Sequence, residues 1–274
     1  MTDSIHTTVI HDKPLISVIV ATRNSECTLR ACLDSLRYNL AEVERPEEVE
    51  VIFIDGYSSD RTVEIIRSYN LGKLFSYPPR GRADAFNRGV ENSSGYFVTF
   101  LHSDDEYSPG YLAGLLKRAR RYKGQNVVIY TSVKFIDEMG KELYIRKPAP
   151  YIGFIQKYQS IIFHPNALYP THLMREFPFE VLPGDMPSDR QQVYRLMRHA
   201  RPIRDANLYY CFRISEHSQI VRLGRSQGFN RSVPFQVKLI QFIGRIYIQA
   251  YETRLIERLL NFIINGQTPW RPKQ

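Results

Sequence analysis

Three apolar runs rich in β-branched and aromatic residues constrain the fold of this chain more than any other feature. They are LISVIVA at residues 15–21, EVEVIFID at 48–55 and YFVTFL at 96–101. Such runs are typical of strands that are covered on both faces of a parallel sheet. Segments with helical periodicity separate them, and the first of these segments places on one face Leu29, Cys32, Leu33 and Leu36. This alternation predicts an α/β fold with a mainly parallel sheet flanked by helices.

Polar side chains follow each of the three runs at the point where the strand is expected to end. In open α/β sheets, ligands bind outside the carboxyl ends of the strands. Three strand ends that deliver polar groups to one edge therefore indicate a ligand site. The residues concerned are Thr22, Arg23 and Asn24 after the first run, Asp55 after the second, and Asp104 and Asp105 after the third.

The adjacent carboxylates of Asp104 and Asp105 are the most unusual of these groups. Two like charges repel each other and resist burial, so something positive should offset them. The sequence alone leaves open a basic side chain, a metal ion or water. We expect the loop that carries them to be exposed.

The second part of the chain has a different pattern. Residues 126–146 predict two extended segments joined by a turn at 138–140, and residues 187–200 predict a helix that begins near Ser188 or Asp189. From Val237 onward one polar stripe at helical spacing lies opposite a wide apolar face. We therefore expect one domain with a C-terminal helical extension.

The charge is concentrated in the last third of the chain. The net charge is +9, and residues 198–258 hold eleven Arg and Lys against four Asp and Glu. A basic region of this kind indicates an anionic partner such as phosphate, acidic lipid or nucleic acid, or a solvated basic surface. Three cysteines without a framework, a polar N-terminus and no apolar run of about 20 residues predict a cytoplasmic protein.

The order of the motifs resembles the family 2 glycosyltransferases of the GT-A fold, in the branch that builds bacterial surface and exopolysaccharides. The matching pieces are SVIVATRN, VIFIDGYSSDRT, GRADAFNRG, GYFVTFLHSDDEYSPGYL, FHPNALY and SDRQQVYRL. The resemblance implies a GT-A domain at 1–218, with a nucleotide-sugar half at about 14–122 (the first half) and an acceptor half at about 123–218 (the second half). A helical extension at 219–274 follows.

The resemblance also implies the activity. Such an enzyme moves a sugar, with inversion, from a nucleotide-diphosphate donor, here expected to be a UDP-sugar, to a saccharide or lipid-linked saccharide. A divalent cation, Mn²⁺ or Mg²⁺, bridges the donor diphosphate and neutralises the acidic pair. We expect Asp105 to be its direct ligand, Asp104 to face the ribose or the waters of the metal, and His217 to be a further ligand. The family often has an acid where this chain has His102.

The remaining roles follow position by position. Thr22 and Asp55 are expected to contact the nucleotide, together with Arg23 and Asn24 beside them. The segment that lies against the nucleotide sugar in the family matches Arg82, Asp84 and Asn87. The catalytic base of the family lies six residues before an Arg on a helix, which corresponds to Asp189 and Arg195, with Asp185 as a nearby rival.

Other function classes fit less well. Nucleotidyl transfer needs a glycine-rich phosphate loop after the first strand, and ATRNSECTLR has no glycine. Nucleic-acid binding predicts exposed aromatics among the basic residues, whereas Tyr209, Tyr210 and Tyr247 fall in expected core strands or helix faces. No nucleic acid is therefore expected as a partner. A non-catalytic relative that binds nucleotide sugars is a further alternative.

The C-terminal helices are expected to pack on their own domain, form a homodimer or attach peripherally to the inner face of the cell membrane.

Overall fold

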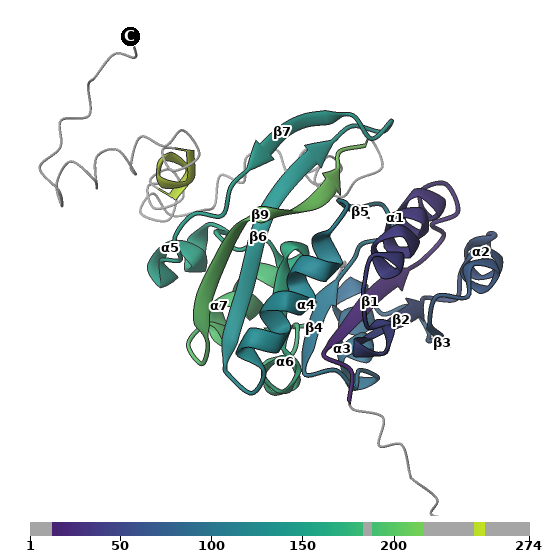
Figure 1. Cartoon of the computed structure of the whole chain (residues 1–274), viewed down its shortest axis with the longest axis horizontal. Helices are drawn as coiled ribbons and strands as arrows, with labels where there is room; N and C mark the ends of the chain where they lie inside the picture. Colours follow the sequence, from purple (N-terminus) through teal and green to yellow (C-terminus); the bar gives the residue numbers. More distant parts are fainter. Residues whose placement is uncertain (1–12, 183–187, 216–243, 250–274) are drawn as a thin grey trace, which may run out of the picture.

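The computed structural model describes residues 13–182, 188–215 and 244–249. Four parallel strands form the first half of a twisted sheet in the order β3-β2-β1-β4 (Figure 1). The central strand β1 is buried along almost its whole length because it has a parallel neighbour on each side and helices on both faces. The bounds are β1 (Ile16–Thr22), β2 (Val49–Asp55), β3 (Lys73–Ser76) and β4 (Phe97–Phe100).

The second half continues the same sheet with mixed strand directions. β8 (Ala167–Pro170) is antiparallel to β4 and to the long strand β6 (Val127–Ile136). β9 (Arg201–Arg213) runs parallel to β6 and carries the short strand β5 (Glu106–Tyr107) on its other edge. β7 (Glu142–Arg146) pairs with β6 as the predicted hairpin. Since β5 comes directly after the acidic pair, this pairing carries that loop across to the end of β9.

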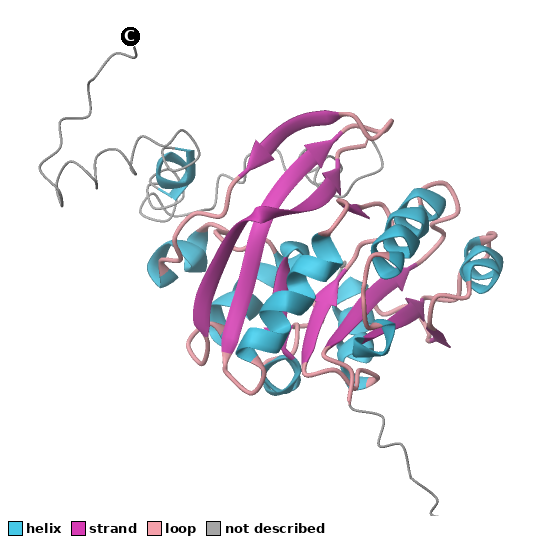
Figure 2. Cartoon of the chain, in the orientation of Figure 1, coloured by secondary structure: helices cyan, strands magenta, loops and turns pink. Residues whose placement is uncertain are grey.

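Helices cover both faces of the sheet (Figure 2). The face that carries Val18 and Val20 packs against three helices, and the face that carries Ile19 packs against three others, as the alternation of side chains along a strand requires. The first set is α1 (Leu29–Ala41), α2 (Thr62–Tyr69) and α4 (Tyr111–Tyr122). The second set is α3 (Arg82–Glu91), α6 (Thr171–Glu176) and α7 (Asp189–Leu196).

Three short elements complete the described chain, namely η1 (Pro46–Glu48), α5 (Gly153–Tyr158) and η2 (His164–Asn166). Residues 244–249 are helical and pack on α5, where Ile248 joins Ile155 in a small apolar cluster. The Tyr247 hydroxyl donates to the carbonyl oxygen of Pro150 at 3.1 Å. The rest of the predicted C-terminal extension lies outside the described residues. Among the described residues, no helix has both the length and the apolar character that crossing a bilayer requires.

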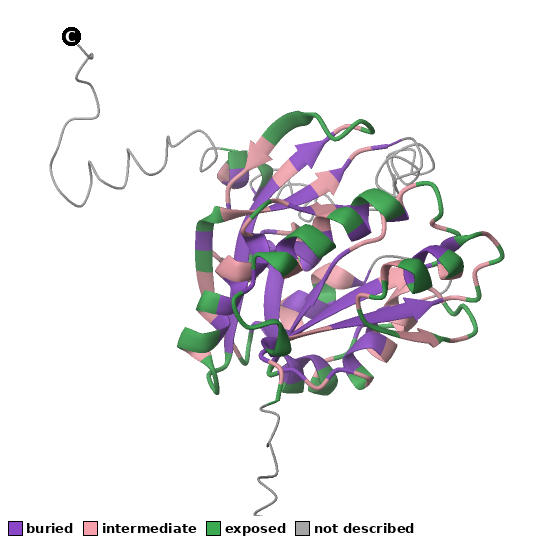
Figure 3. Cartoon of the chain, turned by 45° about the vertical axis from the view of Figure 1, so that its right-hand side comes forward, coloured by how far each residue is buried: buried purple, intermediate pink, exposed green. Residues whose placement is uncertain are grey.

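The burial pattern explains why the strands could be read from the sequence. The strands β1, β2 and β4 in the middle of the molecule are largely buried, the outer strand β7 is mostly exposed, and the helices are buried only on the faces that meet the sheet (Figure 3). Leu29, Cys32, Leu33 and Leu36 of α1 are all fully buried, as their spacing predicts. The prediction of an α/β fold with a mainly parallel sheet flanked by helices is confirmed, and the antiparallel pairs are confined to β5, β7 and β8.

Candidate active site

The loops after β1 and β2 are joined through Asp55. The Thr22 hydroxyl donates to Asp55 Oδ1 at 3.1 Å, and the Ser58 hydroxyl donates to the same oxygen at 2.6 Å. The Ser58 backbone N–H donates to Asp55 Oδ2 at 2.9 Å. Asp55 is only 1% exposed. A carboxylate offers about four acceptor sites, so this arrangement leaves room for about one further donor.

The same two loops contain left-handed backbone. Asn24 has φ 49° and Tyr57 has φ 51°. Asn24 adopts this conformation readily, and its Oδ1 accepts a hydrogen bond from the Ser59 backbone N–H at 2.9 Å. Tyr57 differs from Asn24, because left-handed backbone is strained for a residue with a bulky side chain. The Tyr57 side chain is exposed. Arg23 is also exposed at this edge, so the predicted nucleotide-binding residues of β1 and β2 do lie together.

The loop after β4 holds the acidic pair, and Asp105 is buried there. The Tyr210 hydroxyl donates to Asp105 Oδ2 at 2.7 Å, and the Arg213 backbone N–H donates to Oδ1 at 2.8 Å. The Nδ1 atom of His102 lies 3.3 Å from Asp105 Oδ2. The expectation of an exposed loop is wrong for this residue, which is 1% exposed, because β5 pairs with β9 and draws Asp105 beneath the end of that strand.

Asp104 is more exposed than Asp105, and its surroundings shift the pKa of its own carboxyl. Burial, followed by the charge of Asp105, raises the pKa of the Asp104 carboxyl above its ordinary value. His102 and Arg82 act in the opposite direction, which places the first residue of α3 within electrostatic range of the acidic pair. His102 and Arg82 therefore offset part of the negative charge of the acidic pair, as one of the alternatives from the sequence requires.

His102, Asp104 and Asp105 could together hold a cation. One ligand atom from each of the three lies within 4.8 Å of the others. The Nε2 atom of His102 is buried and has no hydrogen-bond partner within the described part of the chain, although a buried polar atom normally has one. Two carboxylates and an imidazole form a donor set that suits a divalent ion. Sequence reasoning did not assign His102 to this group, and its place two residues before the acidic pair was the available signal.

On α3, two of the predicted nucleotide-sugar residues have contacts within the protein. The Asn87 amide donates to the Phe179 carbonyl oxygen at 2.9 Å and accepts from the Phe179 N–H at 2.9 Å. Asp84 Oδ2 lies 3.9 Å from Arg88 Nε. Asn87 thus fixes the segment that leads toward α7, and its predicted role against the nucleotide sugar stays a prediction.

Asp189 lies in the second half as the first residue of α7, directly after Ser188. Its charge contributes, after burial, to raising the pKa of the buried Tyr169 hydroxyl, so the two groups are near each other. That hydroxyl donates to the backbone oxygen of His164 at 3.2 Å, and the His164 ring lies 6.0 Å from the His102 ring between centroids. A packed series of buried residues therefore connects the first residue of α7 to the acidic loop.

The remaining residues around α7 include two with defined surroundings and two that lie outside the described residues. Arg195 donates to the Pro178 carbonyl oxygen at 2.8 Å and pairs with Glu180, so it holds the segment before α7. Burial lowers the pKa of His164, and neither of its ring nitrogens has a hydrogen-bond partner in residues 13–182, 188–215 and 244–249. Asp185, the rival base, and His217, the further metal ligand, lie outside the described residues.

Comparison with known sequences gives one family. The model of Glycosyl transferase family 2 matches residues 17–180. A putative glycosyltransferase EpsH of Bacillus subtilis is 30% identical over 112 residues, which are 39% of this chain and 31% of that protein. A PGL/p-HBAD biosynthesis glycosyltransferase of Mycobacterium bovis is 32% identical over 118 residues, which are 41% and 43% of the two chains. The chain thus spans less than half the length of these curated relatives.

Solved structures of low sequence identity share the fold. TarS of Staphylococcus aureus in complex with UDP-GlcNAc superposes with a TM-score of 0.57 at 20% identity, over 92% of this chain and 76% of that one. The mannosyltransferase PcManGT of Pyrobaculum calidifontis, in complex with GDP-Man and Mn²⁺, gives 0.56 at 19% identity, over 94% and 77%. These similarities establish the fold, and the chemistry of the site is inferred from its own residues.

Proposed function

The chain belongs to glycosyl transferase family 2, and from this premise we propose that it is an inverting, metal-dependent glycosyltransferase with a nucleotide-sugar donor, most simply a UDP-sugar. The observation that carries the proposal is the group of His102, Asp104 and Asp105 at the carboxyl end of β4. It lies in the family-2 segment and beside the joined loops of β1 and β2. The complexes of the structural relatives, with UDP-GlcNAc in one and with GDP-Man and Mn²⁺ in the other, support a nucleotide-sugar donor.

The first half is proposed to bind the donor. Thr22, Arg23, Asn24 and Asp55 would receive the nucleoside at the ends of β1 and β2. Asp55 is held by three internal hydrogen bonds, so it would present its remaining acceptor site in a fixed direction. Arg82, in electrostatic range of Asp104, would add positive charge near the diphosphate, and Asp84 and Asn87 on the same helix would line the sugar.

The acidic loop is proposed to hold Mn²⁺ or Mg²⁺ through Asp105, Asp104 and His102, with His217 as a further ligand. When bound, such an ion neutralises the acidic pair and stabilises the negative charge that develops on the leaving nucleoside diphosphate. The buried contacts of Asp105 with Tyr210 and Arg213 keep this loop in one geometry before the donor arrives.

Asp189 is proposed to be the base. An inverting transfer requires a carboxylate to take the proton of the acceptor hydroxyl while that oxygen attacks the anomeric carbon from the face opposite the leaving group. The first turn of a helix stabilises the ionised form of such an acid. Asp189 lies on α7 in the second half and the cation site lies at the end of β4 in the first half, so base and cation would come from different halves of the domain.

The acceptor is proposed to be a saccharide or a lipid-linked saccharide. The basic last third of the chain suits peripheral attachment to an anionic membrane, where basic residues contribute about 1 kcal/mol each. Sedimentation with vesicles tests this, because attachment predicts that the protein pellets with anionic and not with neutral vesicles, and that salt releases it. A homodimer through the C-terminal helices is the alternative, and it predicts a doubled mass in light scattering without vesicle binding.

Calorimetric titration of UDP and GDP, each with and without Mn²⁺, tests the central proposal. We expect UDP to bind and Mn²⁺ to strengthen that binding. Binding of GDP and not of UDP would change the proposed donor to a GDP-sugar, and the proposed glycosyltransferase activity would stand. Absence of binding for both nucleotides, in a protein that is folded by circular dichroism, would contradict the proposed function.

A further inference from the structure

Arg213 is a buried cation at the end of β9, close to the acidic loop. It is 6% exposed, and its backbone N–H donates to Asp105 Oδ1 at 2.8 Å. Its guanidinium reaches the same loop twice more, since Nε donates to the Asp104 carbonyl oxygen at 3.0 Å and Nη2 pairs with the Glu106 carboxylate. One residue of the second half therefore contacts all three acidic residues of the loop.

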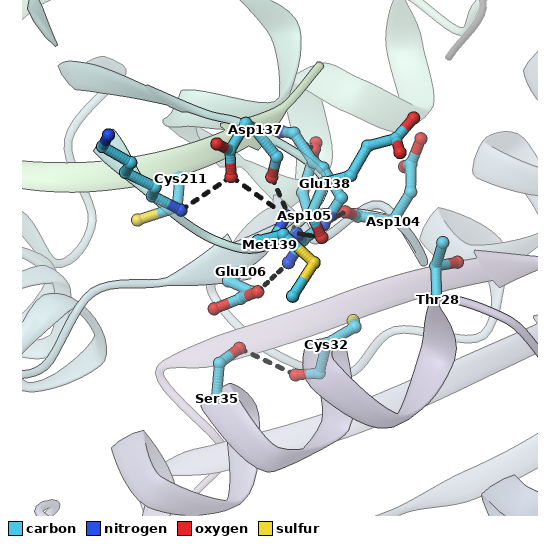
Figure 4. A network of polar contacts seen from close by, with 12 residues as sticks. Thr28, Cys32, Ser35, Asp104, Asp105, Glu106, Asp137, Glu138, Met139 and Cys211 are labelled. Carbon is cyan, nitrogen blue, oxygen red and sulfur yellow. Dashed lines mark hydrogen bonds and ion pairs between the residues drawn. The ribbon is translucent and has the colours of Figure 1, made fainter. Parts of the chain in front are cut away.

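The same guanidinium also contacts the turn of the β6–β7 hairpin. Nη1 donates to the carbonyl oxygens of Asp137 at 2.9 Å and Glu138 at 2.7 Å. In Figure 4, Asp104, Asp105 and Glu106 of the loop lie close to Asp137, Glu138 and Met139 of the turn. Arginine suits this place because its planar fork offers five N–H donors in fixed directions, whereas the lysine ammonium is a single point charge.

The hairpin turn that receives Arg213 is itself ordered. Asp137 Oδ1 accepts hydrogen bonds from the backbone N–H groups of Met139 and Lys141, both at 2.9 Å. Gly140 completes the turn with φ 82°, a conformation that favours glycine. The two carbonyl oxygens that face Arg213 are thus held by a compact turn.

We propose that Arg213 is a positioning residue for the cation site: its guanidinium ties the acidic loop 104–106 to the hairpin turn 137–140, so that the turn sets the geometry of the carboxylates and hence the affinity for the cation. This inference rests on the proposed metal-dependent function. Partners that orient metal ligands from outside the coordination sphere typically change metal affinity by about 10–100-fold when they are replaced.

The test measures the Mn²⁺ concentration at which UDP binding is half-maximal, a quantity independent of turnover. Arg213→Lys keeps the charge and loses the fork, and we expect it to raise that concentration by about tenfold. Asp137→Ala loosens the turn without changing the acidic loop, and we expect a smaller rise in the same direction. Arg118→Lys is the matched control, because Arg118 pairs with the buried Asp205 at the other end of β9, and it should leave the value unchanged.

The outcomes separate this inference from the function on which it rests. A wild-type protein whose UDP binding ignores Mn²⁺ contradicts the metal-dependent function and the inference together. If the wild type depends on Mn²⁺ and both Arg213→Lys and Asp137→Ala require the same Mn²⁺ concentration as the wild type, the inference alone is overturned. The inference is also overturned if Arg118→Lys raises that concentration as much as Arg213→Lys does. If Arg213→Lys does not fold, the exposed-turn variant Asp137→Ala decides, since an unchanged value there overturns the inference.

Discussion

The two halves of the sheet hold their polar groups in different ways. In the first half, the carboxylates at the strand ends are engaged, as Asp55 accepts three hydrogen bonds and Asp105 accepts two besides its contact with His102. In the second half, several buried polar atoms around the start of α7 have no hydrogen-bond partner among the residues that the structure describes. They are the Ser188 hydroxyl, Gln192 Oε1, Asn166 Oδ1 and both ring nitrogens of His164.

This difference indicates which polar groups are already held in place before a ligand binds. Native proteins leave few buried polar atoms without partners, so each such atom near α7 marks a place where water or a substrate would complete the network. In the described part of the first half the corresponding atoms are His102 Nε2, which belongs to the proposed cation site, and the Tyr107 hydroxyl, whereas the carboxylates of Asp55 and Asp105 are already engaged. The carboxylates of the proposed donor side are thus held by contacts within the protein, whereas polar groups near α7 are left for water or a substrate.

The largest expected effect concerns the second half. Asp189→Asn should lower the turnover number by about 10²–10⁴-fold, because the amide cannot take the acceptor proton. UDP affinity should not change, since Asp189 lies on α7 and not among the strand-end residues that are proposed to bind the donor. Steady-state transfer assays and calorimetry on the same preparation measure the two quantities.

Asp185→Asn serves as the comparison for this experiment. Near-normal turnover in Asp189→Asn combined with a collapse in Asp185→Asn would move the base to the rival position. A loss of UDP affinity in Asp189→Asn would instead break the division of labour between the halves.

The second prediction separates the two acids of the loop. Asp105→Ala should abolish the effect of Mn²⁺ on UDP binding and also lower the free energy of unfolding by about 2–4 kcal/mol, because the Tyr210 hydroxyl and the Arg213 N–H lose their buried acceptor. Asp104→Ala should weaken the Mn²⁺ effect with little loss of stability. Urea unfolding and calorimetry check the pair. Equal stability of the two variants would show that the contacts of Asp105 do not order the loop.

The sequence predicted the first half well because its information is local. A buried strand and the polar residues that follow it are adjacent in the chain, so the strand ends bearing Thr22, Asp55 and Asp104 could be placed on one edge without knowing the tertiary structure. The predicted helix faces followed in the same way from spacing alone, as the fully buried side chains of α1 confirm.

The burial of Asp105 and the role of Arg213 could not be predicted in this way. Both depend on β9 returning beside β6 and pairing with β5, a contact between residues more than one hundred positions apart. Nothing near HSDDEY in the sequence indicates that its second acid will accept hydrogen bonds from Tyr210 and Arg213. His102 is an intermediate case, because its position beside the acids was visible although its role was not.

The third prediction uses the pKa of Asp104. Burial and the Asp105 charge raise this pKa in the folded state, so the ionised carboxyl destabilises the cation-free protein, and that penalty disappears as the pH falls through the folded pKa. Protons therefore compete with Mn²⁺ at a pH above the ordinary value of about 3.9 for Asp. We expect the increase in melting temperature caused by Mn²⁺ with UDP to shrink as the pH falls toward this raised pKa.

Asp104→Asn is the control for the pH series. At neutral pH it should melt at a higher temperature than the cation-free wild type, since it removes an unfavourable buried charge, and it should show a flatter pH profile. A cation-free Asp104→Asn that melts below the wild type would mean that the carboxylate is already neutralised by His102 and Arg82.

The smallest expected effect tests whether the first half stores strain. Among the described residues, the non-glycine residues with left-handed backbone are Asn24, Tyr57 and Asn70, all in that half. Tyr57→Gly should relieve about 1–2 kcal/mol of strain. The added freedom of the unfolded chain costs about 0.4–1 kcal/mol, so a net stabilisation of about 0.5–1 kcal/mol is expected. Asn70→Gly, at the end of α2, should gain nothing because asparagine already tolerates this conformation. Urea unfolding of both variants decides: a Tyr57→Gly protein less stable than wild type would show that the exposed ring makes stabilising contacts that outweigh the strain.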